Sequence, residues 1–261
     1  MRKKKLNEIK RICKKLIIDD EFCDRYFIND ILSEDVEIIF LLESPHNEEV
    51  KCKHPLAGKS GVNMTKFFCK VFNLTEPRYC NKIAPFGKLV QDAHDTNIDD
   101  KNFVDLYTNS KLRVKLRKIG IMNVCNIPLQ MQVYCCDDIR KYCEVFRILD
   151  FLRNRANFTN RIGQNASDKN FTQNVIKNSL CSKVSNYKST LFVPMGNFAL
   201  SYLEECNSTL NLKIFLVDSK PIPHPSPLSK EWNKIETLDL SKSKTLLNHF
   251  GSKIKEILEE K

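Results

Sequence analysis

Four short segments of the chain are apolar almost throughout, and they alternate with longer stretches that have the spacing of helices. The apolar segments are residues 36–43, 121–127, 190–195 and 213–217. Strands of a parallel sheet have this composition because helices cover both faces of the sheet. The alternation therefore predicts an α/β fold: a three-layer αβα sandwich around a central four-stranded, mainly parallel sheet.

The chain is long enough to bury a sizeable core, with 261 residues of which 42% are hydrophobic. No linker or internal repeat interrupts it, so we expect a single domain over residues 1–261. Within it we expect an N-terminal helical segment at 1–35 and a polar loop or insertion at 157–174. No apolar run reaches about 18 residues, so no membrane span is expected. The basic N-terminus also lacks the apolar core of a secretory signal.

The cysteines and the charge indicate where the protein works and what it meets. The chain has 11 cysteines, an odd number, and no pair with C-x-x-C spacing. This pattern favours free thiols in a reducing compartment over a disulfide framework or a metal site, and predicts a cytoplasmic protein, or a nuclear one in a eukaryote. The formal net charge of +10 suits a polyanionic partner such as nucleic acid, the alternative being a merely solvated lysine-rich surface.

Residues that can do chemistry follow the predicted strands, where ligand sites lie in such sheets. Glu43 ends the first strand, the Gly-containing loop 54–61 comes soon after it, Asn126 lies in the second strand, and His224 follows the fourth. Each also has a purely structural interpretation: a loop-bracing carboxylate, a bare turn, an amide bonded to the fold, or a solvated histidine. His224 stands in "PIPHPSPLS" (221–229), whose prolines hold the backbone in one geometry.

Taken in order, these segments resemble the uracil-DNA glycosylase superfamily. "HPSPLS" (224–229) has the same residues as the His-Pro-Ser-Pro-Leu-Ser loop of that superfamily. "ESPHNEE" (43–49) followed by "HPLAGKSG" (54–61) is similar to the Glu-Ala-Pro-Gly arrangement of its bacterial and archaeal branches. "VCNIPL" (124–129) resembles the strand that carries the base-reading asparagine, and "TLFVPMGNFAL" (190–200) resembles the strand and turn with Leu-Gly-x-x-Ala.

The resemblance implies a monofunctional DNA glycosylase that flips a pyrimidine nucleotide into the pocket and hydrolyses its N-glycosidic bond. His224 would stabilise the anion that develops on the base, and Glu43 would stabilise the sugar cation or orient the attacking water. Ser44, which stands where the best-known branch has an aspartate, joins them as a catalytic candidate. No metal or organic cofactor is implied, and the protein is expected to act as a monomer.

The remaining site residues follow from the same resemblance. Asn126 would read the polar edge of the base, in a pocket that also includes Pro45, His46 and Leu56. Leu228 would wedge into the base stack. Contacts with the DNA strand are implied for Lys59, Ser60, Asn197, Ser226, Leu228 and Ser229.

The pocket departs from the family pattern at two positions. His46 replaces a glycine, and Leu56 replaces the aromatic residue that stacks on uracil. A ring from Phe40, Phe67, Phe86 or Tyr134 would have to replace that stacking, which is worth about 1–3 kcal/mol. These changes, with the polar stretch 130–134, leave open uracil in base-excision repair or a bulky 5-substituted viral pyrimidine in antiviral defence.

Two other functions remain compatible with the sequence. One is a catalytically weak or inactive DNA-binding protein of the same fold, which Ser44 favours. The other is a general α/β nucleotide hydrolase or transferase. That function calls for a phosphate loop or a cluster of metal-binding carboxylates, and neither occurs in convincing form.

Overall fold

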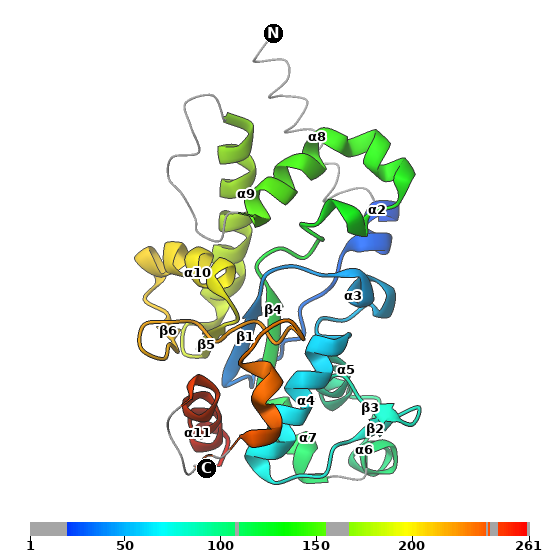
Figure 1. Ribbon diagram of the computed structural model, residues 1–261, viewed down its shortest axis with the longest axis vertical. Helices are drawn as coiled ribbons and strands as arrows, with labels where there is room; N and C mark the ends of the chain where they lie inside the picture. Colours follow the sequence, from blue (N-terminus) through cyan, green and yellow to red (C-terminus); the bar gives the residue numbers. More distant parts are fainter. Residues whose placement is uncertain (1–19, 108–109, 155–166, 239, 241–244, 260–261) are drawn as a thin grey trace.

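The computed structural model describes residues 20–107, 110–154, 167–238, 240 and 245–259. Its centre is a four-stranded, all-parallel sheet with the strand order β4-β1-β5-β6 (Figure 1). The strands are β1 (Ile38–Leu42), β4 (Ile119–Asn123), β5 (Leu191–Pro194) and β6 (Lys213–Ile214). The prediction of an αβα sandwich is confirmed.

The side chains of β1 alternate between two apolar layers, as the pleat of a strand requires. Ile38, Phe40 and Leu42 face one layer, and Ile39 and Leu41 face the other. The first layer contains α4 (Lys59–Phe72), α5 (Phe86–His94), α7 (Ser110–Arg117) and α11 (Leu246–Glu259). The second contains α2 (Asp20–Tyr26), α8 (Cys136–Arg153), α9 (Ser167–Val184) and α10 (Asn197–Leu210).

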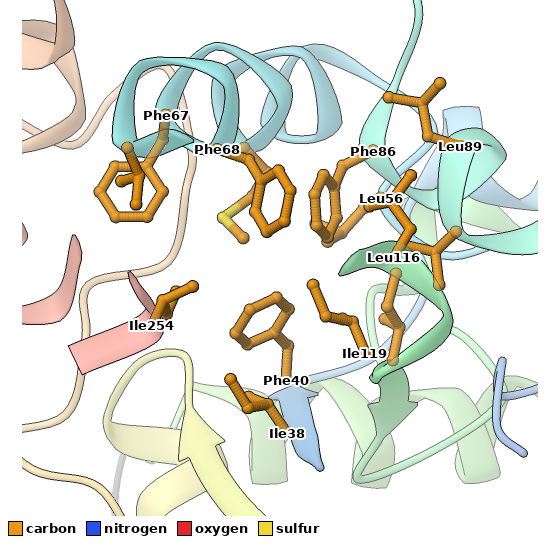
Figure 2. Close-up of a cluster of buried hydrophobic side chains, with 14 of the residues drawn as sticks. Ile38, Phe40, Leu56, Phe67, Phe68, Phe86, Leu89, Leu116, Ile119 and Ile254 are labelled. Atoms are coloured by element: carbon orange, nitrogen blue, oxygen red, sulfur yellow. The ribbon is translucent and has the colours of Figure 1, made fainter. Parts of the chain in front are cut away.

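Aromatic rings dominate the first layer. Figure 2 shows Phe40 on β1 pointing toward Phe68 and Phe86, which come from α4 and α5. The ring centroids of Phe40 and Phe86 lie 6.0 Å apart, and those of Phe68 and Phe86 lie 5.4 Å apart. Such packing holds α4, whose N-terminus faces the site described below, firmly on the sheet.

The remaining elements are short and lie around this frame. They are α3 (Asn47–Cys52), the hairpin β2 (Arg78–Tyr79) and β3 (Lys82–Ile83), α6 (Asp100–Tyr107), and the 3₁₀ turns η1 (Met131–Val133), η2 (Ser185–Tyr187) and η3 (Trp232–Thr237). Within the described part of the chain, no helix has both the length and the apolar character needed to cross a bilayer.

The predicted loop at 157–174 is wrong from Ser167 onward, where α9 begins. Its inward face includes Thr172 and Gln173, both buried, as well as Ile176 and Leu180. Polar residues at core positions interrupt the apolar repeat from which a helix is recognised. The rest of that loop, and residues 1–19 of the predicted N-terminal helical segment, lie outside the described residues.

The cysteines also differ in part from the prediction of free thiols. Cys181 on α9 and Cys206 on α10 form a disulfide, with their Cα atoms 5.2 Å apart. The sequence does not reveal this pair because the two residues become neighbours only when α9 and α10 pack on the same face of the sheet. The other cysteines whose state the structure describes are free: Cys52, Cys69, Cys80, Cys125, Cys135, Cys136 and Cys143.

Candidate active site

A cleft of about 970 Å³ opens beyond the carboxyl ends of the strands. Its walls come from the segment after β1, the N-termini of α4 and α10, the segment after β4, the end of α8 and the loop after β6. The residues lining it include Glu43, His46, Lys59, Ser60, Gln130, Gln132, Arg153, Asn197, Phe198, His224 and Ser226. Six segments of the sequence thus contribute polar side chains to one site.

Glu43 lies directly after β1 and forms an ion pair across the cleft. Its Oε1 accepts a hydrogen bond from Arg153 Nε at 2.8 Å. Burial raises the pKa of Glu43, and the charge and hydrogen bond of Arg153 oppose that rise. The carboxylate is therefore partly desolvated and held at the strand end by a single guanidinium.

Two histidines face each other across the same cleft. The ring centroids of His46 and His224 lie 6.2 Å apart. Burial, together with the charges of His46 and Arg153, lowers the pKa of His224 to about 4. The pKa of His46 is also lowered, first by burial and then by Arg153. His224 is consequently neutral at pH 7, and one of its ring nitrogens carries a proton that it can donate.

The loop that carries His224 is anchored to two helices. Trp232 Nε1 donates to the carbonyl of Pro223 at 2.8 Å, and Asn63 Nδ2 on α4 donates to that of Pro225 at 3.0 Å. Leu228 lies just beyond these anchors and is 92% exposed. Leu228 is therefore an exposed apolar side chain on a braced loop beside the cleft.

The same loop contains a tight turn. Ser226 Oγ accepts the backbone N–H of Leu228 at 3.2 Å, and the Ser226 carbonyl accepts that of Ser229 at 3.0 Å. Ser226 lines the cleft, and Ser229 lies next to the exposed leucine. The turn therefore fixes Leu228 relative to the cleft.

Two long helices begin at the cleft and present their positive ends to it. Lys59 and Ser60 open α4 after Gly58, and Asn197 opens α10 after Gly196. Neither N-terminus has a side-chain cap or an acidic residue in its first turn. Their backbone N–H groups and the helix dipoles thus favour an anion in the cleft.

Three of the predicted site residues are buried beside the cleft and do not line it. The Ser44 hydroxyl accepts the Leu129 backbone N–H at 3.4 Å. Pro45 is buried next to it. Leu56, 1% exposed, lies beside Phe86 in the apolar cluster of Figure 2. Hydrophobic burial explains the position of Leu56, since a leucine gains more in the core than at a polar wall.

Asn126 does not reach the cleft either. The strand was predicted to extend to residue 127, but β4 ends at Asn123 because its neighbour β1 ends at Leu42. Asn126 Nδ2 donates to the Ile28 carbonyl at 2.7 Å and to Asp30 Oδ1 at 2.9 Å. Its oxygen accepts from Lys183 Nζ at 2.8 Å. The side-chain amide of Asn126 therefore links the segment after β4 to the segment at 28–30 and to α9.

Asn123 is the amide that the sequence analysis missed. It is the last residue of β4, is 0% exposed, and faces the same layer as Ile119 and Ile121. Neither its Oδ1 nor its Nδ2 has a hydrogen-bond partner among the described residues. A buried, unpartnered amide costs about 1–3 kcal/mol, so such a group calls for a functional explanation. The sequence did not show that the strand ends at Asn123, and this boundary would have directed attention to Asn123.

The rings proposed to replace the family's stacking residue also lie elsewhere. Phe40, Phe67 and Phe86 belong to the first apolar layer and Tyr134 to the second. The phenylalanine that lines the cleft is Phe198, in the first turn of α10. Phe198 is itself 5% exposed and also belongs to the second apolar layer.

Glu49 on α3 connects the segment directly after β1 with the Gly-containing loop at 54–61. Its carboxylate accepts the backbone N–H of His46 at 2.7 Å and that of Leu56 at 2.6 Å. We expect Glu49→Ala to lower the free energy of unfolding by about 2–3 kcal/mol, because two buried N–H groups lose their acceptor. Urea unfolding measures this. Glu48→Ala is the matched control, because exposed Glu48 forms a surface ion pair with Lys51, and its loss should cost under about 0.5 kcal/mol.

The same residue should make stability depend on pH. Burial raises the pKa of Glu49 to about 7, against the two amide hydrogen bonds. The unfolded chain loses this proton near pH 4.5, before the folded chain does, so the contribution of Glu49 to stability declines as pH rises from 4.5 to 7. Glu49→Gln should remove that slope, and an unchanged slope would contradict the assignment.

Comparisons of the chain with models of protein families, with curated proteins and with solved structures find no match. Among the described residues, no three His, Cys, Asp or Glu side chains are placed to hold a metal ion together.

Proposed function

We propose that the protein is a monofunctional DNA glycosylase that flips a pyrimidine out of DNA and hydrolyses its N-glycosidic bond. The observation that carries this proposal is a polar cleft lined by both Glu43 and a neutral His224, together with the 92% exposed Leu228 on the loop that carries His224. The product is an abasic site, and its formation would serve base-excision repair or antiviral defence.

Three features support DNA as the substrate. The net charge is +10, and the uncapped N-termini of α4 and α10 meet at the cleft next to Lys59. Phosphates are the anions that such helix ends and a lysine hold well. Leu228 stands where it can enter the stack and fill the space of the flipped base, as wedge residues do. Ser226, Ser229, Ser60 and Asn197 supply further polar contacts to the strand.

The reaction needs only groups that surround the cleft. As the glycosidic bond breaks, its electron pair moves onto the base, and the neutral His224 donates a hydrogen bond to the base carbonyl. Glu43 stabilises the positive charge that develops on the sugar and orients the water that attacks C1′. The water's hydroxyl bonds to the sugar carbon, and its proton leaves with the base or with solvent.

Asn123 is proposed as the residue that reads the base, in place of Asn126. Its carboxamide offers one donor and one acceptor side by side, as the edge of a pyrimidine requires. The base also needs a stacking ring, which Phe198 supplies. Because Asn123 is sealed from solvent, the side chains that cover it have to shift when a nucleotide enters.

The test is base release from synthetic DNA. Wild-type protein should generate alkali-labile sites in oligonucleotides that contain its target pyrimidine, and mass spectrometry should identify the free base. Glu43→Gln should slow release about 10²-fold, because the neutral amide cannot stabilise the sugar cation. Binding to the same DNA should remain, which a mobility-shift measurement checks.

Ser44 favours the second candidate, a DNA-binding protein of the same fold without activity. Its buried hydroxyl bonds to Leu129 and does not face the cleft, so it cannot replace an aspartate there. If wild type, Glu43→Gln and His224→Ala bind DNA equally well and release no base from any oligonucleotide, this candidate replaces the glycosylase.

A further inference from the structure

Arg153 is a residue of the cleft that no motif in the sequence indicated. It is the last residue of α8, and its guanidinium reaches back to the segment after β1. Besides the bond to Glu43, Arg153 Nη2 lies 2.6 Å from the side-chain oxygen of Gln130, when that amide is oriented with its oxygen toward the donors. The same oxygen lies 3.2 Å from His46 Nδ1. Gln130 therefore links the arginine to one wall of the cleft.

A structural role explains only part of this placement. A cation at the C-terminus of a helix is favourable, and so is a partly buried ion pair. Yet Arg153 is paired with Glu43, the carboxylate that the proposed reaction needs in order to stabilise the positive charge on the sugar. No contact of its Nη1 is found among the residues described. A guanidinium carries five N–H donors and no acceptor, so the arginine retains donors for a ligand.

The wall around Arg153 is polar and roomy. Gln130 and Gln132 have side-chain amides 3.0 Å apart, and both line the cleft together with His46. The cleft's volume of about 970 Å³ lies at the upper end of the range for small-molecule sites. A bare pyrimidine would leave these polar groups without partners, which is unfavourable once water is displaced.

We infer that Arg153, with Gln130, recognises an oxygen-bearing group at C5 of the excised pyrimidine. The inference rests on the proposed function, in which Asn123 and His224 already use the hydrogen-bonding edge of the ring. The partner of Arg153 must then lie off that edge, and it must be an acceptor. Hydroxyl and carboxyl oxygens meet this condition, and paired oxygens match the guanidinium fork. Arg153 leaves Glu43 for this group when the nucleotide enters, so the correct base frees the carboxylate.

The experiment compares single-turnover base release from oligonucleotides of one sequence that differ in one base. The bases are uracil, thymine, 5-hydroxymethylcytosine, its glucosylated form and 5-carboxylcytosine. Wild-type protein should release at least one of the three oxygen-substituted cytosines at least tenfold faster than uracil. Arg153→Met should reduce that ratio at least tenfold, and Arg153→Lys, which keeps the charge without the fork, should reduce it less.

Arg147→Met is the matched control, because Arg147 lies on the same helix and pairs with Glu144 on the exposed surface. It should leave the ratio unchanged. Thermal unfolding shows whether each variant folds. If Arg153→Met does not fold, Gln130→Leu tests the same wall of the cleft. Release of uracil alone, or a ratio unaffected by Arg153→Met, overturns the inference and leaves the glycosylase standing. Release of no base from any of these oligonucleotides overturns both.

Discussion

Asn123→Leu should abolish base release and at the same time raise the stability of the protein. Leucine has the branched outline of asparagine but no polar atoms, so it removes a buried amide that has no partner. The expected gain is about 1–3 kcal/mol, reduced by the greater size of its methyl groups. Loss of the two Asn123 hydrogen bonds to the pyrimidine edge should lower kcat/KM by about 10³-fold or more. Urea unfolding and single-turnover base release measure the two effects.

Asn126→Leu is the matched control for this experiment. Asn126 lies three residues further along but bonds to Ile28, Asp30 and Lys183. Its replacement removes these three hydrogen bonds, although Lys183 and Asp30 keep their mutual ion pair, so stability should fall by about 1–3 kcal/mol. If Asn123→Leu is the less stable variant, or if it retains activity, the assignment of Asn123 as the base reader is wrong.

His224→Ala should lower the rate of base release about 10²- to 10³-fold, the usual cost of removing a preorganised donor to a developing anion. Binding of DNA should change little, because Lys59 and the helix N-termini remain. Single-turnover rates at saturating protein measure the chemical step without the binding step. A variant with wild-type rates would remove His224 from the mechanism.

The pH dependence of His224 adds an independent check. Its pKa lies near 4 in the folded protein, against 6.5 for an ordinary histidine. The neutral donor therefore persists down to about pH 5, and titration of His224 should not produce an acid limb near pH 6.5. Between pH 6.5 and 4 the unfolded chain binds the extra proton first, so stability falls as pH falls. His224→Ala should remove that decline in stability.

The layers of the fold could be predicted because a strand that is buried on both faces of the sheet has an almost continuous apolar sequence. Segment 36–43 is apolar almost throughout, and it became the central strand β1. The helix α9 escaped prediction because Thr172 and Gln173 occupy core positions. Helical periodicity can be seen only when the buried face is apolar.

The site was predictable where a residue's role depends on its place after a strand. Glu43, His46 and His224 do meet at one cleft. Asn123, which the proposed function uses in place of Asn126, could not be singled out because a strand's end depends on where its neighbour stops, and that is a tertiary property. Arg153 was missed for a similar reason. It comes from the far end of a helix, where no local pattern separates a ligand-facing arginine from a solvated one.

The braced loop has a consequence for how the protein is made. Pro223 is held by Trp232, whose ring in turn packs at 5.4 Å against Phe67, and Phe67 stacks on Phe250 of the last helix. The loop's geometry thus depends on residues that leave the ribosome after it. A chain that stops between Arg153 and Trp232 contains Glu43 and Arg153 but lacks the support for His224 and Leu228. On the proposed function, the capacity to damage DNA therefore appears only after the segment around Trp232 has been synthesised.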